Sequence, residues 1–139
     1  MPSPTDLPAA DTPPDDLDLL LGAAIEAAAR LLSTNGEFYP FAIAVDASGE
    51  LVAPEITPTG DHPAAEEVLD LLVAALREGE GLRATVLCSD VRLADRDSDA
   101  IRLDLEPREG DALTVLVPYV PGPVLEDPFG VPGTRRVFA

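Results

Sequence analysis

Apolar residues recur at helical spacing in two segments of the chain. In residues 15–35, Leu and Ala lie three or four positions apart, which predicts an amphipathic helix. Acidic residues at its start suit the positive end of the helix dipole, and Asn35-Gly36 is a typical stop because both residues tolerate left-handed backbone angles. Residues 63–78 have the same spacing, and we expect Asp61 or His62 to cap this second helix.

The other apolar segments alternate with polar residues or are short and β-prone, which predicts strands. We expect strands at residues 41–46, 51–56, 82–93, 101–106 and 112–120. Residues 121–132 are rich in Pro and Gly and are expected to form a loop, and residues 135–138 are expected to add a short last strand.

The resulting order of elements is α-β-β-α-β-β-β. Short connections between strands predict hairpins and therefore an antiparallel sheet. We predict an α+β fold: a two-layer sandwich in which two helices cover one face of an antiparallel sheet of about five strands. Residues 1–14, rich in Pro and Asp, are expected to form a flexible tail, and residues 15–139 a single domain. Roadblock-like and profilin-like domains have the same order of elements, but topology alone does not fix function.

Composition narrows the classes of partner. The chain is 46% apolar and carries a formal charge of −17, so a packed but strongly acidic domain is expected. Nucleic acid and anionic membranes should repel it, whereas basic proteins, cations, neutral small molecules or a second copy are acceptable partners. The charge also has simpler explanations, namely solubility or salt adaptation. All nine basic residues are Arg, a bias typical of GC-rich genomes.

Cellular location follows from weaker signals. Cys88 is the only cysteine, which excludes an internal disulfide and favours a reducing compartment. The first residues lack a basic start and an apolar signal core, and no apolar run reaches the roughly 18 residues that span a bilayer. We therefore expect a cytoplasmic protein.

An acidic run offers weak metal candidates. Asp95, Asp97 and Asp99, with Glu106 further on, match positions 1, 3, 5 and 12 of a calcium-binding loop. The template requires Gly at position 6, where this chain has Ala100, and it requires a preceding helix where a strand is expected. A polar hairpin loop is the favoured interpretation, and we expect no metal and no cofactor.

No catalytic constellation is apparent. His62 is the only histidine, and Cys88 lies in an apolar strand, where a thiol has little reactivity. A Walker phosphate loop requires Lys, which the chain lacks, and no Gly-x-Ser-x-Gly motif is present. Four carboxylates adjoin ordered segments and could be structural, for instance through pairing with Arg92 or Arg102: Glu37, Asp46, Asp90 and Asp104. We predict no catalytic residues.

The segment Gly36-Glu37-Phe38-Tyr39-Pro40-Phe41 contains three of the six aromatic residues. Phe38 and Phe41 are expected to join the first helix to the sheet. Glu37 and Tyr39 are then left for contact with another molecule. Tyr119 could complete an aromatic binding patch, because aromatic residues are frequent at binding hot spots.

These motifs, with Val45-Asp46-Ala47-Ser48-Gly49-Glu50 and Val117-Pro118-Tyr119, resemble a group of small, uncharacterised bacterial proteins. That group shares the Gly-Glu-Phe-Tyr-Pro-Phe stretch and a later strand ending in Pro-Tyr, although Ala42 replaces a Gly found in many members. The resemblance implies bacterial origin and brings no activity, catalytic residues or binding residues with it. By analogy, some small acidic bacterial α+β proteins are immunity proteins against toxins.

The leading interpretation is a non-enzymatic acidic binding or interaction domain. Three alternatives remain open: an immunity protein that neutralises a toxin, a carboxylate- or metal-dependent enzyme, and a regulatory domain that binds a small ligand.

Overall fold

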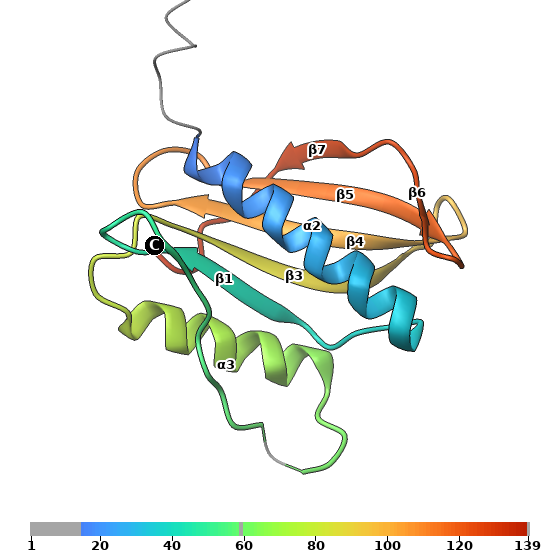
Figure 1. Cartoon of the computed structure of the whole chain (residues 1–139), viewed down its shortest axis with the longest axis horizontal. Helices are drawn as coiled ribbons and strands as arrows, with labels where there is room; N and C mark the ends of the chain where they lie inside the picture. Colours follow the sequence, from blue (N-terminus) through green and yellow to red (C-terminus); the bar gives the residue numbers. More distant parts are fainter. Residues whose placement is uncertain (1–14, 59, 139) are drawn as a thin grey trace, which may run out of the picture.

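The computed structural model describes residues 15–58 and 60–138, and the predicted tail at residues 1–14 lies outside this range. The described residues form two helices and one seven-stranded antiparallel sheet (Figure 1). The elements are α2 (Asp16–Asn35), β1 (Phe41–Val45), β2 (Leu51–Val52), α3 (Ala65–Glu78), β3 (Ala84–Leu93), β4 (Ser98–Pro107), β5 (Leu113–Val120), β6 (Val124–Leu125) and β7 (Phe129–Pro132). The strand order is β2-β1-β3-β4-β5-β6, and β7 also pairs with β5. The α+β class and the antiparallel sheet are thus confirmed.

Helix α2 begins and ends where the sequence predicts. The Asp15 side chain caps it by accepting a hydrogen bond from the backbone N–H of Leu17 at 2.9 Å. At the other end Gly36 takes a left-handed conformation, φ 77°, and its N–H donates to the carbonyl of Leu32. The buried face repeats every four residues: Leu20, Ala24, Ala28 and Leu32. Helix α2 lies across β1, β3 and β4 (Figure 1).

The two helices cover opposite faces of the sheet, so the expectation that both lie on one face is wrong. In β3, Val86 belongs to the hydrophobic cluster under α2, while the adjacent Leu87 packs with the apolar face of α3. In β1, Val45 belongs to the cluster under α2, and the adjacent Ala44 belongs to the cluster under α3. Neighbouring strand residues point to opposite faces, so each strand contributes to two cores. Every residue from Ala84 to Ser89 is buried, as in strands that are covered on both faces. The corresponding signal in the sequence is that this run contains no charged residue.

Four local expectations need correction, the first two at helix α3 and strand β2. Helix α3 starts after Ala64, which makes no side-chain cap, so neither Asp61 nor His62 caps it. Strand β2 is only Leu51–Val52, since Pro54 lacks the N–H that a longer pairing with β1 would require.

Residues 121–132, expected as a loop, contain β6 and β7, which pair back onto β5. Both edges of the sheet are short, and β7 ends at Pro132. Short edge strands that include Pro discourage pairing with a second chain.

Residues 133–138, which we call the C-terminal segment, do not form the expected strand. They are held by Glu106, a buried side chain of β4 that is 4% exposed. Its carboxylate accepts hydrogen bonds from the backbone N–H groups of Arg136 at 2.8 Å, Val137 at 2.9 Å and Phe138 at 2.7 Å. Val137 is thereby placed in the core beneath α3. A carboxylate thus replaces a neighbouring strand as the acceptor for this backbone.

Arginine side chains hold the same end of the sheet. The guanidinium of Arg135 donates to the backbone carbonyls of Pro107, Arg108 and Gly110. Arg108 in turn lies over the Phe138 ring, 4.8 Å from its centroid. These contacts join the β4–β5 connection to the C-terminal segment.

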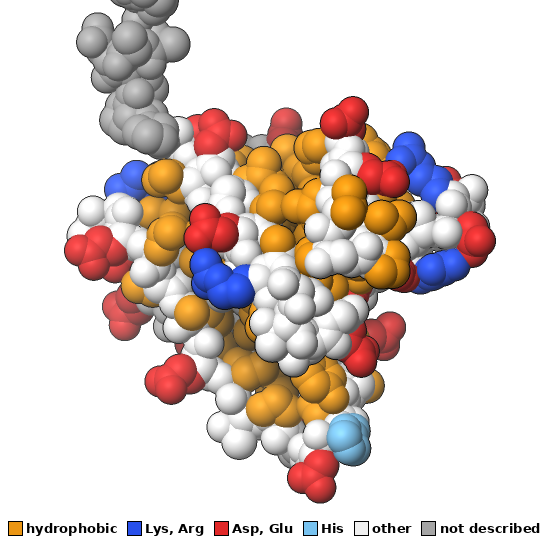
Figure 2. Space-filling view, turned by 45° about the vertical axis from the view of Figure 1, so that its right-hand side comes forward, with side chains coloured by type: hydrophobic (Ala, Val, Ile, Leu, Met, Phe, Trp, Pro, Cys, Tyr) orange, Lys and Arg blue, Asp and Glu red, His pale blue; other side chains and the backbone are white. Residues whose placement is uncertain are grey.

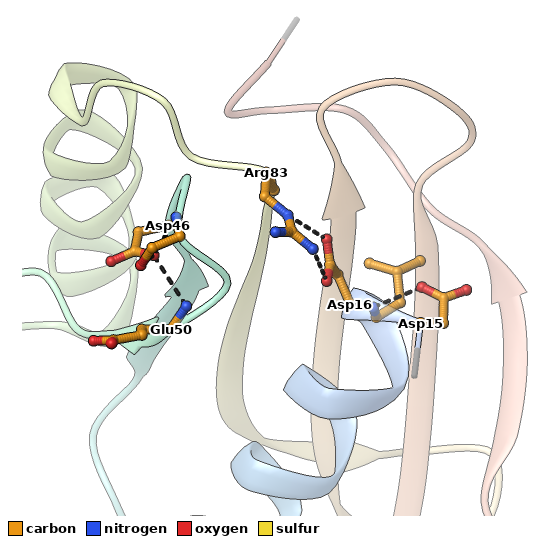
Figure 3. Close-up of polar contacts among 7 residues, drawn as sticks. Asp15, Asp16, Asp46, Glu50 and Arg83 are labelled. Carbon is orange, nitrogen blue, oxygen red and sulfur yellow. Dashed lines mark hydrogen bonds and ion pairs between the residues drawn. The ribbon is translucent and has the colours of Figure 1, made fainter. Parts of the chain in front are cut away.

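The first turn of α2 is fixed at this end as well (Figure 3). Arg83, just before β3, forms a bidentate pair with Asp16, with N–O distances of 2.8 and 3.0 Å. Nearby, the Asp46 carboxylate accepts hydrogen bonds from Ser48 and from the Glu50 N–H, which closes the turn between β1 and β2. These hydrogen bonds lower the pKa of Asp46, and the bond from the Ser48 hydroxyl contributes most.

Candidate functional site

A pocket of about 630 Å³ lies at the opposite end of the sheet, where α2 ends and α3 begins. Leu31 and Asn35 of α2, residues 37–40 of the following connection, Ala65 of α3 and Asp90 of β3 line it. Figure 2 turns the corresponding side of the molecule forward and shows hydrophobic side chains gathered there, with acidic side chains around them. The pocket therefore combines apolar walls with carboxylates.

The local sequence explains the position of the exposed side chains. After the left-handed Gly36, the rings of Phe38 and Phe41 contact each other with centroids 5.7 Å apart, and both pack against the core under α2. Because these two residues are turned inward, Glu37 and Tyr39 are left outside. Tyr39 is 53% exposed. The division predicted within the aromatic segment is confirmed as to burial, while the binding role of Glu37 and Tyr39 stays a prediction.

Tyr119 does not share a surface patch with Tyr39, contrary to expectation. It is 6% exposed and belongs to the core under α2. Its hydroxyl donates a 2.7 Å hydrogen bond to the carboxylate of Asp90, which lines the pocket. Tyr119 therefore orients a pocket residue from the core side of the pocket. Tyr119 thus contacts Asp90, which lines the same pocket as Glu37 and Tyr39 and which the sequence marked only as one of several carboxylates.

The environment of Asp90 shifts the pKa of its carboxyl upward. Partial burial raises its pKa, and the neighbouring carboxylates Asp99 and Glu37 raise the pKa further. Hydrogen bonds from the Tyr119 hydroxyl and the Phe38 backbone act in the opposite direction. Burial also raises the pKa of Tyr119, as does its hydrogen bond to Asp90. The phenol therefore stays protonated and keeps donating to the carboxylate.

Asp97, Asp99 and Glu106 make other contacts instead of forming a metal site. Asp95, Asp97 and Asp99 belong to the β3–β4 hairpin, where Arg92 pairs with Asp97 and, at 3.3 Å, with Asp99. Glu106, the fourth ligand of the template, holds the C-terminal segment at the other end of β4. Within residues 15–58 and 60–138, no three His, Cys, Asp or Glu side chains come together as metal ligands. The calcium-loop spacing is thus not reproduced in space.

The remaining candidates have structural surroundings. His62 is exposed. Cys88 is fully buried in β3, and burial raises the pKa of its thiol, which disfavours the reactive thiolate. Asp104 accepts hydrogen bonds from Thr114 at 2.7 Å and from Arg102. Of the four carboxylates singled out in the sequence, Asp46 and Asp104 stabilise the fold, whereas Glu37 and Asp90 line the pocket.

Comparison with known proteins does not assign the chain to a family. No protein-family profile matches the sequence, and no curated protein or solved structure is significantly similar to it. The resemblance based on the aromatic segment therefore stays a prediction. In the part of the chain that the structure describes, no helix is sufficiently long and apolar to cross a membrane.

Proposed function

We propose that this chain is a non-enzymatic acidic binding domain, which contacts a protein partner through the pocket formed by residues 37–40, α2 and Asp90. The observation that carries the proposal is the state of the side chains on the pocket rim. Within the described residues, no side-chain hydrogen bond or ion pair engages Asn35, Glu37 or Tyr39. An exposed aromatic ring beside unused polar groups is typical of a binding hot spot.

The surroundings of the pocket support a protein partner. Leu31 and Phe38 supply apolar wall, and Tyr39 presents a rigid ring that loses little conformational freedom on binding. The chain has a formal charge of −17, so electrostatic steering would favour a basic partner. A toxin neutralised by an immunity protein is one partner of this kind, and neutralisation would be a specific case of the proposed function.

A carboxylate-dependent enzyme is the second candidate. The raised pKa of Asp90 beside a pocket favours it, since general acids commonly have such values. However, the pocket lining contains no second group arranged as a nucleophile with its base. Asp90 is hydrogen-bonded to Tyr119, an arrangement that also serves to orient a carboxylate for binding.

Site-specific photocrosslinking tests the binding proposal. A benzophenone amino acid would replace Tyr39, and in a control protein it would replace Leu51, which is 45% exposed at the other end of β1. We expect a defined crosslinked product from position 39 only. We also expect the product to weaken when Glu37→Gln and Asp90→Asn are added, because both variants remove charge from the pocket. Equal products from both positions, or none from position 39, would contradict the proposal.

A further inference from the structure

We infer that the pocket receives an arginine side chain of the partner protein, with the guanidinium between Asp90 and Glu37 and against the Tyr39 ring. This inference rests on the proposed function and specifies the chemistry by which the partner is recognised. Three independent features of the structure support it: the internal use of the chain's own arginines, the nature of the pocket walls, and the burial of Asp90.

The first feature is that, within the described residues, no arginine pairs with Glu37 or Asp90. All nine arginines lie in the described residues, and each contacts a group outside the pocket. Five of them form ion pairs with carboxylates elsewhere: Arg30, Arg83, Arg92, Arg102 and Arg136. The others contact backbone carbonyls or aromatic rings: Arg77, Arg96, Arg108 and Arg135. The charge of the pocket is therefore left for a cation from another molecule.

The second feature is the match between the walls and the shape of arginine. The side chain of arginine has an apolar stem and a planar cationic head that stacks on aromatic rings. Leu31 and Pro40 supply apolar surface for the stem, and Tyr39 supplies an exposed ring for the head. Lysine would satisfy the charge but not the planar contact. A guanidinium can pair with the carboxylates and also stack on the ring, so the pocket favours arginine over lysine.

The third feature is that Asp90 is half-buried and is oriented by a residue of the core. Its hydrogen bond from Tyr119 fixes the carboxylate, so an incoming donor meets an acceptor that is already in place. Partial burial also strengthens the attraction, because the local dielectric constant is lower than in water. Repulsion from Glu37 and Asp99 disfavours the charged state of Asp90 in the free protein. A bound cation would relieve this repulsion.

The test is a titration of the full chain followed by NMR. The probe is the acetylated and amidated peptide Gly-Gly-Arg-Gly-Gly, compared with the same peptide carrying citrulline, a neutral isostere of arginine. We expect the arginine peptide to shift the amide signals of residues 37–39, Phe41 and Asp90 in a saturable manner. The citrulline peptide should bind at least about tenfold more weakly, since it lacks the charge that the carboxylates attract.

Matched variants separate the pocket from the general acidity of the chain. Asp90→Asn and Glu37→Gln should each weaken binding of the arginine peptide by about threefold or more. Glu109→Gln removes the same charge from an exposed position at the other end of the sheet, and it should leave binding unchanged. The inference is overturned by equal binding of citrulline, by shifts centred outside the pocket, or by equal losses in Glu109→Gln and Asp90→Asn.

The two proposals fail in distinguishable ways. If position 39 crosslinks a partner but the arginine peptide does not bind, the binding face stands and the arginine inference is wrong. If the peptide binds in the pocket but position 39 crosslinks nothing, the proposed protein partner is wrong and the pocket chemistry stands.

Discussion

The two ends of the sheet use their polar side chains in opposite ways. At the end that holds the C-terminal segment, Glu106 and Arg135 are directed at the backbone of the chain itself. At the pocket end, Glu37 and Tyr39 extend from a connection whose shape is set by apolar and backbone features. Polar groups that stabilise the fold and polar groups offered to a partner are therefore separated along the strands. The comparison predicts that substitutions at the first end change stability and substitutions at the second change binding.

The largest effect is expected at Glu106. Glu106→Ala leaves three backbone N–H groups at the C-terminal segment without their acceptor, and buried unsatisfied donors are costly. We expect the free energy of unfolding to fall by about 3 kcal/mol, measured by urea denaturation. Glu109→Ala, an exposed carboxylate in the adjacent turn, should change it by less than about 0.5 kcal/mol. If both variants were equally stable, the C-terminal segment would not depend on this carboxylate.

An intermediate effect is expected at Phe41, where the pocket end does depend on folding contacts. Phe41→Ala removes the ring that contacts Phe38 and packs under α2. Because Phe41 is only half-buried, the expected loss is about 2 kcal/mol, below the roughly 3 to 5 kcal/mol of fully buried rings. Tyr39→Ala in the same denaturation series should cost little. A larger loss for Tyr39→Ala than for Phe41→Ala would reverse the assignment of the two rings.

The smallest effect is expected at Asp90, and its sign is opposite. A carboxyl whose pKa is raised by folding costs stability once it is ionised, and the cost is absent below the pKa of the unfolded chain, about 3.9. The wild-type protein therefore loses stability from this group as the pH rises through the raised pKa. Asp90→Asn removes the charge and keeps an acceptor for the Tyr119 hydroxyl.

We accordingly expect Asp90→Asn to be slightly more stable than the wild type at pH 7, and the difference to shrink toward pH 3.5. Urea denaturation of both proteins at several pH values checks this difference, and Glu109→Gln controls for the loss of a surface charge. A variant that is less stable at pH 7 would show that the ionised carboxylate stabilises the fold.

The sequence predicted the parts of the fold that depend on neighbours along the chain. The helical spacing of Leu20, Ala24 and Ala28 located α2, and Asn35-Gly36 located its end. The inward position of Phe38 and Phe41 also followed from local pattern. The placement of α3 on the far face was missed, although the continuous burial-prone run of β3 carries that information.

Contacts between distant residues could not be predicted in the same way. Glu106 and Val137 are 31 positions apart, and Asp90 and Tyr119 are 29 apart. In a chain with 26 acidic residues, no local feature distinguishes Glu106 from the others. Asp90 is nevertheless the carboxylate on which the proposed recognition of a cation in the pocket depends. A charged residue that follows an unbroken buried run in a central strand is the one signal that could have singled it out.

The burial of Cys88 has a practical consequence for experiments on this protein. Its thiol lies in the middle of the sheet under α2, opposite Phe41 of β1, and it is the only thiol in the chain. An alkylating reagent reaches the sulfur only when the helix separates from the sheet. The rate of native-state alkylation, followed by mass spectrometry, therefore reports how often that separation occurs. The unmodified protein thus contains its own chemical probe of opening, placed beneath the helix that ends at the pocket.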